Sequence, residues 1–330
     1  MSLNTTYLGI PVKSPIIVGS CGLTSGVESI VEMAENGAGA VVLKSIFEEE
    51  ILLEYERDVM SQIGPMDNDL EFFDYYDYQI KNEVLEKYKN LISSVKKKVD
   101  FPVIASINCI SNGEWVSYAK KLEDCGADGL ELNILKLPFD SKRDSKEIEH
   151  LYLDIIKSIK NRLSIPIAVK IAPYFTNLGE FAKRLSISGV SGIVLFNKYY
   201  SIDFDINNEK IISGDILSHA GDYVMPLRWM SVLSKKVDCD LIASTGVHDI
   251  DVAIKMLLAG ADGVQVVSAL YRNGFEFIDK LNAGILHWMD KKGYKKIEDF
   301  KGKLSQTSAD KPEIYERVQF MKYYSDHKHV

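Results

Sequence analysis

Gly260-Ala-Asp-Gly-Val264 is one of four copies of a short phrase that decides the fold of this chain. In each copy a helical pattern ends on glycine and an apolar strand pattern begins. A glycine at the end of a helix adopts the left-handed conformation without steric cost, so the chain can turn at once into a buried strand. The other three copies are Gly37-Ala-Gly-Ala-Val41, Gly126-Ala-Asp-Gly-Leu130 and Gly189-Val-Ser-Gly-Ile193.

Each phrase opens one strand, and a further apolar run lies between successive phrases. The runs are rich in β-branched residues, as expected of parallel strands buried on both faces. Together they predict an α/β protein, a (β/α)₈ TIM barrel. A doubly wound open sheet is the alternative, but the first strand is not followed by its usual Gly-x-Gly-x-x-Gly turn. The predicted strands are 16–20, 40–45, 102–108, 129–133, 167–173, 192–197, 241–246 and 263–268.

The length of 330 residues suits one barrel domain with insertions, which we place at residues 1–303. Strongly periodic helical patterns cover 83–99, 145–163, 249–258 and 275–292. Two insertions, at about 47–79 after strand two and 198–225 after strand six, follow strands and so predict a lid or pocket wall over the barrel mouth. Residues 304–330 form a charged tail that we expect to dock on the outside of the barrel.

Composition excludes several classes of function. The formal net charge is −8 and no dense Lys/Arg stripe interrupts it, so we expect no nucleic-acid partner. No secretory segment or long apolar run occurs, so we expect a soluble, cytoplasmic protein without membrane contact. The cysteines lack a Cys-x-x-Cys pair, which argues against a disulfide frame, a metal site and an iron–sulfur cluster. They are Cys21, Cys109, Cys125 and Cys239.

Polar residues end the strands, where eight positions converge on the catalytic face of a barrel. Three of them are asparagines, whose amides suit a planar ligand with alternating carbonyl and N–H groups. Helix capping explains one such asparagine well, but three at equivalent ends favour a ligand. The strand-end residues are Ser20, Gly22, Lys44, Ser45, Asn108, Asn133, Lys170, Asn197, Gly246, Ser268 and Ala269.

Two features predict an anionic ligand. Lys170 lies within the apolar run Val169-Lys-Ile171, where an unpaired ammonium would be costly, so we expect it to face an anion. The loops after strands seven and eight, at 245–249 and 268–274, occupy the usual phosphate-binding position of barrels. The alternative for these loops is ordinary capping by Asp249 and a glycine-relieved turn at Gly274.

Taken together, these motifs resemble the FMN-dependent dihydroorotate dehydrogenases, particularly the soluble class, which also resembles the pyrimidine-reducing half of dihydropyrimidine dehydrogenase. The likeness runs from about Leu8 to about Lys301. It rests on Asn4-Thr-Thr-Tyr-Leu-Gly-Ile-Pro-Val-Lys-Ser-Pro-Ile16, Ala38-Gly-Ala-Val-Val-Leu-Lys-Ser45, Glu131-Leu-Asn133, Val169-Lys-Ile-Ala-Pro-Tyr-Phe175, Ser244-Thr-Gly246 and Gly263-Val-Gln-Val-Val-Ser-Ala-Leu270.

The resemblance implies FMN as cofactor and assigns roles residue by residue. Lys170 would lie by the flavin pyrimidine edge, and Lys44 would contact both flavin and substrate, with Ser45 beside it. Gly22 and its neighbours, Ser20 included, would pack on the isoalloxazine. The implied phosphate residues are Gly246, Val247, Ser268 and Ala269; the implied ring-binding asparagines are Asn133, Asn197 and Asn108, the last as in the membrane-associated class.

The chain also departs from the family. The family's Cys or Ser general base corresponds to Lys136, which could act as a base only if burial or a nearby cation lowered its pKa. The alternative is a solvated loop residue or a charge partner of the acidic insertion. The substrate loop after strand two reads Ser61-Gln-Ile-Gly-Pro-Met-Asp-Asn68, in which Asn68 could supply the missing amide. Lys198 replaces a usual Ser or Thr and would make the substrate pocket more cationic.

The resemblance predicts oxidation of dihydroorotate, or of a related dihydropyrimidine or cyclic carboxylate, to orotate in pyrimidine biosynthesis, with hydride transfer to flavin N5. Two alternatives stay open: a phosphate-binding barrel enzyme without flavin that uses Lys170 as a Schiff base, and a protein that holds FMN without dehydrogenase activity. A homodimer is usual for the soluble class. Since the chain lacks a cysteine cluster, an iron–sulfur route to an electron acceptor would need a partner subunit.

Overall fold

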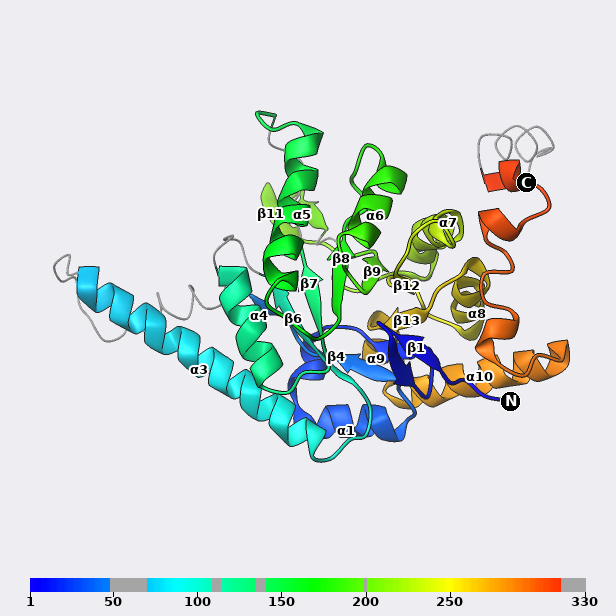
Figure 1. Cartoon of the computed structure of the whole chain (residues 1–330), viewed down its shortest axis with the longest axis horizontal. Helices are drawn as coiled ribbons and strands as arrows, with labels where there is room; N and C mark the ends of the chain where they lie inside the picture. The colour runs from blue at the N-terminus through cyan, green and yellow to red at the C-terminus, as the bar shows by residue number, and fades with distance from the viewer. Residues whose placement is uncertain (48–69, 109–113, 135–140, 199–200, 316–330) are drawn as a thin grey trace.

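Eight parallel strands form a closed barrel in the computed structural model of this chain, with helices around it (Figure 1). The structure describes residues 1–47, 70–108, 114–134, 141–198 and 201–315. The strands, in order around the ring, are β3 (Ile16–Val18), β4 (Ala40–Val42), β6 (Val103–Asn108), β7 (Gly129–Asn133), β8 (Ile167–Ile171), β9 (Gly192–Leu195), β12 (Asp240–Ala243) and β13 (Gly263–Val266).

The ring closes where β13 pairs with β3, at Val264–Ile16 and Gln265–Ile17. The short strand β5 (Ile46–Phe47) follows β4 and also pairs with β6. Closure excludes the doubly wound open sheet, so the predicted (β/α)₈ barrel is confirmed. All eight predicted strands are present; β7 has the predicted bounds, and most of the others end earlier than predicted because the chain leaves the ladder before its polar residues.

Helices follow the strands in the order that the glycine phrases predict. They are α1 (Val27–Glu35), α3 (Leu70–Lys96), α4 (Glu114–Asp124), α5 (Ser145–Lys160), α6 (Leu178–Ile187), α7 (Val224–Leu233), α8 (Ile250–Ala259), α9 (Ser268–Asn273) and α10 (Glu276–Lys292). The phrase glycines have φ values of +84°, +90°, +95° and +117°. The left-handed turn that the repeated phrase predicts is therefore present at Gly37, Gly126, Gly189 and Gly260.

The start of α3 differs from the sequence prediction. The helix begins at Leu70, whereas the periodic pattern was strong only from Glu83. Residues 70–79, which we expected to belong to the first insertion, are helical. The aromatic and acidic residues in this stretch have weaker helix propensity than Ala or Leu, which explains why its composition resembled a loop. Residues 48–69 of that insertion lie outside the described residues.

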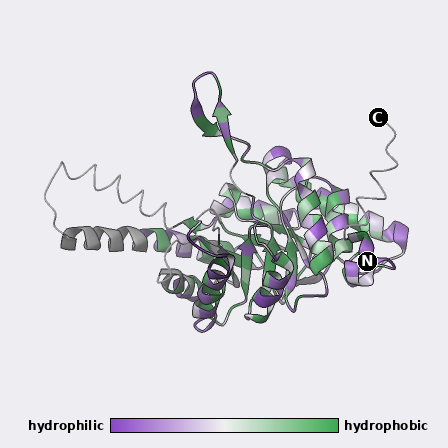
Figure 2. Cartoon of the chain, turned by 90° about the horizontal axis from the view of Figure 1, so that it is seen from above, coloured by the Kyte–Doolittle hydropathy of each residue, from purple (hydrophilic) through white to green (hydrophobic). Residues whose placement is uncertain are grey.

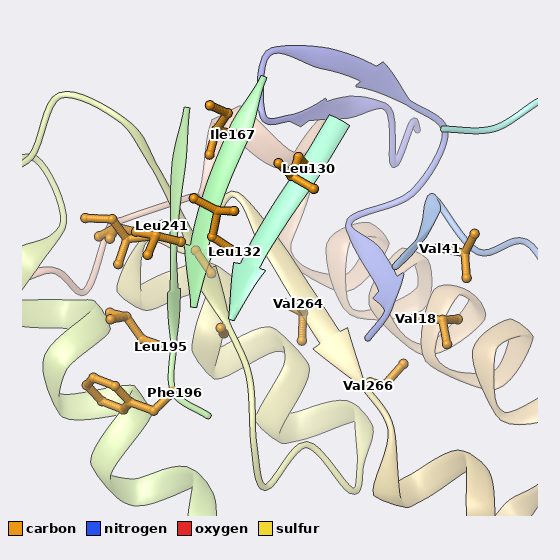
Figure 3. Packing of buried hydrophobic residues seen from close by; sticks show 14 of the residues in the cluster. Val18, Val41, Leu130, Leu132, Ile167, Leu195, Phe196, Leu241, Val264 and Val266 are labelled. Carbon is orange, nitrogen blue, oxygen red and sulfur yellow. The ribbon is translucent and has the colours of Figure 1, made fainter. Parts of the chain in front are cut away.

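Alternating strand residues build two separate apolar layers. Outward-facing residues pack against the helices, among them Leu130 and Leu132 of β7, Leu195 and Leu241 (Figure 3). Inward-facing residues such as Ile104, Ala168 and Val194 pack inside the barrel with Tyr7, Leu8 and Val12. These last three come from the N-terminal hairpin of β1 (Thr5–Tyr7) and β2 (Ile10–Val12).

The N-terminal hairpin closes the barrel at the start of its strands. A Cβ on Gly192, the first residue of β9, would lie 2.4 Å from Leu8 Cδ2, and one on Gly263, the first residue of β13, would lie 2.9 Å from Tyr7 Cδ2. Glycine at these two positions lets the hairpin enter the barrel. The opposite end, at the carboxyl ends of the strands, is therefore the open one.

A second hairpin, of β10 (Ile202–Asp205) and β11 (Lys210–Ser213), lies in the insertion after β9 and stands away from the barrel (Figure 2). Short 3₁₀ turns complete the described chain: η1 (Gly22–Ser25), η2 (Ala220–Tyr223), η3 (Ile297–Asp299), η4 (Gln306–Ser308) and η5 (Pro312–Tyr315).

The part of the tail at 304–315 contacts α7 and α8. The Leu304 N–H donates to the Leu258 carbonyl at 2.8 Å, and Lys235 Nζ donates to Ser308 Oγ at 2.7 Å. Within the described residues, no helix combines the length and the apolar character required to cross a bilayer.

Candidate active site

The open end of the barrel holds a cavity of about 600 Å³, a size typical of cofactor and ligand sites. Most of its walls come from residues at or just beyond the carboxyl ends of strands. Eight residues predicted for the site line it: Ser20, Gly22, Lys170, Asn197, Lys198, Gly246, Val247 and Ser268. The other lining residues are Cys21, Ile216, Leu217, Ser218, Ser244, Thr245, Gln265, Val267 and Tyr271.

The floor of the cavity contains a buried cation. Lys170 of β8 is 7% exposed, and its Nζ donates to Gln265 Oε1 of β13 at 2.9 Å. Gln265 Nε2 in turn donates to Glu131 Oε2 of β7 at 2.6 Å. We expected Lys170 to face an anion; within the protein it contacts a neutral carboxamide, and the nearest carboxylate oxygen, Glu131 Oε1, lies 3.8 Å away.

Two of the predicted asparagines are joined at the open end. Asn197 Nδ2 donates to Asn133 Oδ1 at 2.6 Å, which brings the ends of β9 and β7 together across β8. Asn133 also lies beside Lys170 in the register of β7 and β8. This bond uses the Asn197 nitrogen and the Asn133 oxygen, so the Asn197 oxygen and the Asn133 nitrogen can serve a ring edge with neighbouring N–H and carbonyl groups.

A row of serines connects the ends of the first three strands. Ser45 Oγ lies 3.1 Å from Ser20 Oγ and 2.7 Å from Ser106 Oγ, and the Ser106 N–H donates to the Tyr88 hydroxyl of α3 at 3.0 Å. Burial raises the pKa of Tyr88, so the phenol stays neutral. The row fixes the backbone around Ser20, which lines the cavity wall.

The wall formed after β12 and β13 has the features of an anion cradle. Gly246 has a φ of +81°, and a Cβ there would lie 2.1 Å from the Tyr223 nitrogen, so a side chain would not fit. Its N–H points to Ser218 Oγ at 3.4 Å, and the Ser218 N–H donates to Ser268 Oγ at 2.9 Å. Backbone N–H groups and hydroxyls at such a turn bind phosphate well.

Ser218 also contacts His248, which joins Ser218 and Ser268 as a polar side chain at this wall. The Ser218 Oγ to His248 Nε2 distance is 2.9 Å. Burial lowers the pKa of His248, and the nearby Arg272 lowers it further. The neutral imidazole therefore fixes the Ser218 hydroxyl without adding a charge to the cradle.

The cavity lining includes Lys198 but not Lys44, Asn108 or Ala269. Lys44 is half-buried after β4, where its backbone N–H donates to the Thr24 carbonyl at 3.4 Å. Asn108 is half-buried at the end of β6, and Ala269 is buried in α9. Lys198 Nζ donates to the carbonyls of Asp215 at 3.0 Å and Leu217 at 2.5 Å, so it ties down the end of the second insertion.

Two predicted residues, Lys136 and Asn68, lie outside the described residues, so their roles stay predictions. Sequence reasoning missed Glu131, Gln265 and Ser218. Glu131 and Gln265 do carry a signal, because each is a polar residue at an inward-facing position of an apolar strand. Ser218 has no local signal, since only the folded insertion brings it to the cradle. In the described ranges, no group of three or more His, Cys, Asp or Glu side chains is arranged as a metal site.

Comparison with known proteins gives the family. A family model described as dihydroorotate dehydrogenase matches residues 2–289 of this chain. The chain belongs to the dihydroorotate dehydrogenase family. The resemblance that its motifs indicate is thus confirmed, and the family's dependence on flavin confirms the cofactor prediction at that level.

Curated relatives match nearly full length at low identity. Each is a dihydroorotate dehydrogenase B (NAD(+)), catalytic subunit, an oxidoreductase acting on a CH–CH group, so the predicted enzyme class is confirmed. The relative from Thermoplasma volcanium is 25% identical over 317 residues, with 91% of this chain and 97% of the relative covered. The relatives from Pyrococcus abyssi and Pyrococcus furiosus are 27% and 28% identical, with 91% and 92% of this chain and 98% of each relative covered.

Proposed function

We propose that this chain is the FMN-binding catalytic subunit of an enzyme that oxidises dihydroorotate to orotate in pyrimidine biosynthesis. One observation carries the proposal: a single cavity has the Lys170 ammonium at its floor and the Gly246–Ser268 cradle in its wall. A suitable ligand has a planar ring that can carry negative charge next to Lys170, and a terminal phosphate that the cradle can bind. FMN is such a ligand.

The residues present fit FMN. The phosphate would be held by the Gly246 and Val247 backbone and by Ser268 at the start of α9, with Ala269 following. The ring would lie over Gly22 and Ser20, where the absence of a side chain at Gly22 leaves room beside Tyr271. Lys170 would stabilise negative charge on the pyrimidine edge. The supporting residues Lys44, Ser45, Asn108 and Asn133 would line the remaining edge.

The substrate would lie above the flavin, between the strand-end amides. The Asn197 amide oxygen and the Asn133 amide nitrogen match the N–H and carbonyl edge of a dihydropyrimidine. Lys44 and Lys198 would favour its carboxylate, and Asn108 and Asn68 would complete the set of amides. These groups orient the ring carbon that loses hydride and hold the substrate away from water.

The chemistry needs a proton acceptor as well as a hydride acceptor. Bound FMN supplies the hydride acceptor through N5. For the proton on the adjacent carbon we propose Lys136, the residue at the family's base position. Lys136→Ala should lower dihydroorotate turnover by about 100-fold or more while FMN stays bound. Unchanged turnover would exclude Lys136 as the base.

Two structural facts bear on the alternatives. A Schiff-base lysine needs an amine that is unpaired among apolar groups, whereas Lys170 donates to Gln265 close to Glu131. A protein that only stores FMN would not need the paired amides of Asn133 and Asn197. Both facts favour the dehydrogenase.

The reduced flavin must be reoxidised. The relatives are named as catalytic subunits, which supports a separate electron-acceptor subunit for this chain as well. We also propose that the chain forms a homodimer and acts in the cytoplasm.

Reconstitution of the purified protein tests the cofactor assignment. We expect FMN to bind at least about tenfold more tightly than riboflavin, because only FMN offers a phosphate to the cradle. Ser268→Ala should reduce this advantage, and Ser213→Ala, a change on the exposed β11 strand, should not. Equal affinities for FMN and riboflavin would contradict the phosphate assignment, and no binding of either would contradict the flavoprotein.

A further inference from the structure

Three long polar side chains meet in the middle of the barrel interior, next to inward-facing apolar residues such as Ala168 and Val194. Lys170 is 7% exposed, Gln265 is 1% exposed and Glu131 is fully buried. They project from β8, β13 and β7 respectively. Burial of an ammonium and a carboxylate is costly unless the two charges are paired or hydrogen-bonded, so the contacts among these side chains decide whether the arrangement is stable.

The two charges form an ion pair at 3.8 Å, but no hydrogen bond joins them directly. Lys170 Nζ lies 3.8 Å from Glu131 Oε1, beyond hydrogen-bond distance, and Oε1 has no hydrogen-bond partner within the described part of the chain. The Gln265 carboxamide stands between the charges instead. Its oxygen accepts from Lys170 at 2.9 Å and its nitrogen donates to Glu131 Oε2 at 2.6 Å.

The orientation of the Gln265 carboxamide matches the charges of both neighbours. Its oxygen faces the cation and its nitrogen faces the carboxylate, whereas the flipped amide would place like partial charges together. Gln265 Nε2 also lies 3.4 Å from the Tyr7 hydroxyl of the closing hairpin, a weak contact. The amide is thus held in one orientation by the charges that it separates.

The position of Lys170 depends on this separation. Lys170 and Gln265 line the cavity, while Glu131 does not. Glu131 Oε1, which accepts no hydrogen bond from the described residues, lies 3.8 Å from the Lys170 ammonium. In a buried site a carboxylate at this distance attracts the ammonium strongly. Without an acceptor at the position of Gln265 Oε1, the ammonium would move onto Glu131 and away from the cavity.

We propose that Gln265 is a positioning residue that keeps the buried Lys170–Glu131 pair apart and so reserves the Lys170 ammonium for the cofactor ring. The inference rests on the proposed function, since it concerns the charge presented to bound FMN. It assigns roles to Gln265 and Glu131, two residues that the motif comparison leaves without one.

Sulfite binding to the FMN-reconstituted protein tests the proposal without turnover. Sulfite forms an S–N bond to flavin N5 with its own electron pair, which leaves negative charge on the pyrimidine edge of the ring, where a cation stabilises it. Gln265→Met keeps the side-chain volume but removes the acceptor. We expect the affinity for sulfite to fall about tenfold in this variant.

Removing the carboxylate should reverse the loss. In Gln265→Met/Glu131→Gln the ammonium has no carboxylate to approach, so we expect a sulfite affinity within about threefold of the parent. Tyr7→Phe removes only the weak contact on the far side of Gln265 and serves as the matched control, with unchanged affinity. A Gln265→Met protein that binds sulfite as the parent does, or a double variant as weak as the single one, would overturn the proposal.

A crystal structure of ligand-free Gln265→Met separates this inference from the cofactor assignment and also establishes that the variant folds. We expect Lys170 Nζ within hydrogen-bond distance of a Glu131 oxygen. Lys170 in its parent position would overturn the spacer role even if FMN binds. If the parent protein binds no FMN, the cofactor assignment fails while this crystallographic comparison still decides the role of Gln265.

Discussion

The two ends of the barrel interior use the same strands for different purposes. At the closed end the inward positions are Ile17, Ala40 and Ile104, covered by Tyr7 and Leu8 of the hairpin. At the open end the next inward positions on the strands are polar: Lys170 follows Ala168, Ser106 follows Ile104 and Asn133 follows Glu131. The closed end is filled by protein, and the open end is shaped for a ligand.

Within one strand, the inward residues at the closed end contribute to stability and those at the open end contribute to ligand binding. A parallel strand buried on both faces gains stability from apolar residues at every position, so each polar inward residue needs a partner or a ligand. Glu131 and Gln265 lie at the boundary, where the protein supplies its own partners. We therefore expect changes at the closed end to alter the free energy of unfolding and changes at the open end to alter ligand binding.

The largest effect should come from a pair of tyrosines, one at each end. Tyr7→Ala removes a fully buried side chain and should lower the free energy of unfolding by about 3–5 kcal/mol through the cavity that it leaves. Tyr271→Ala, at a cavity-lining residue that is 46% exposed, should cost under about 1 kcal/mol. Urea unfolding measures both. Equal losses at the two positions would contradict the division between the ends.

A smaller effect concerns Asp240, at the start of β12 beside the closing hairpin. Burial, and then repulsion from Asp262, raise its pKa to about 6 from an ordinary value of 3.8. The folded state therefore holds this proton at a pH where the unfolded chain releases it, so this carboxyl contributes a fall in the free energy of unfolding as the pH rises from about 4 to about 6.

The Asp240→Asn variant tests this pH dependence. It should remove that part of the slope and stabilise the protein at pH 7 by about 2 kcal/mol. Asp100→Asn, at an exposed carboxylate paired with Lys13, is the control and should leave the fall between pH 4 and pH 6 in place. Urea unfolding at several pH values provides the comparison. An Asp240→Asn variant with the same pH dependence as the parent through this window would contradict the account.

The smallest effect should appear at the open end. Asn197→Ala removes half of the amide pair, and we expect the KM for dihydroorotate to rise about tenfold with FMN retained. Asn177→Ala removes the side-chain cap of α6, whose oxygen accepts from the Glu180 N–H. It should cost about 1 kcal/mol of stability and leave KM unchanged. Steady-state kinetics with both variants distinguishes a binding role from a structural one.

Much of the fold could be predicted because its signals are local. The four glycine phrases each require a left-handed residue between a helix and a strand, and that requirement can be recognised without tertiary context. Helix bounds were less predictable where propensity was weak, as at Leu70, which begins α3 well before the strong periodic pattern. Closure of the ring follows from the number of strand-like runs rather than from any single residue.

Sequence could predict only those site residues that lie at the ends of strands. Lys170, Asn197 and Gly246 line the cavity as expected, because the ends of parallel strands meet at one face. The contact between Lys170 and Gln265 could not be predicted, since it joins residues 95 positions apart through the barrel interior. Ser218 reaches the cradle only through the folding of the insertion.

Anaerobic addition of dihydroorotate to the FMN-reconstituted protein, followed by its visible absorption spectrum, tests the central claim most directly. The account predicts that the oxidised-flavin bands bleach and that orotate forms in an amount equal to the flavin reduced. Lys170→Met should bleach more slowly, because the charge on the reduced ring loses its nearest cation. A flavin spectrum that stays unchanged with dihydroorotate would contradict the proposed reaction.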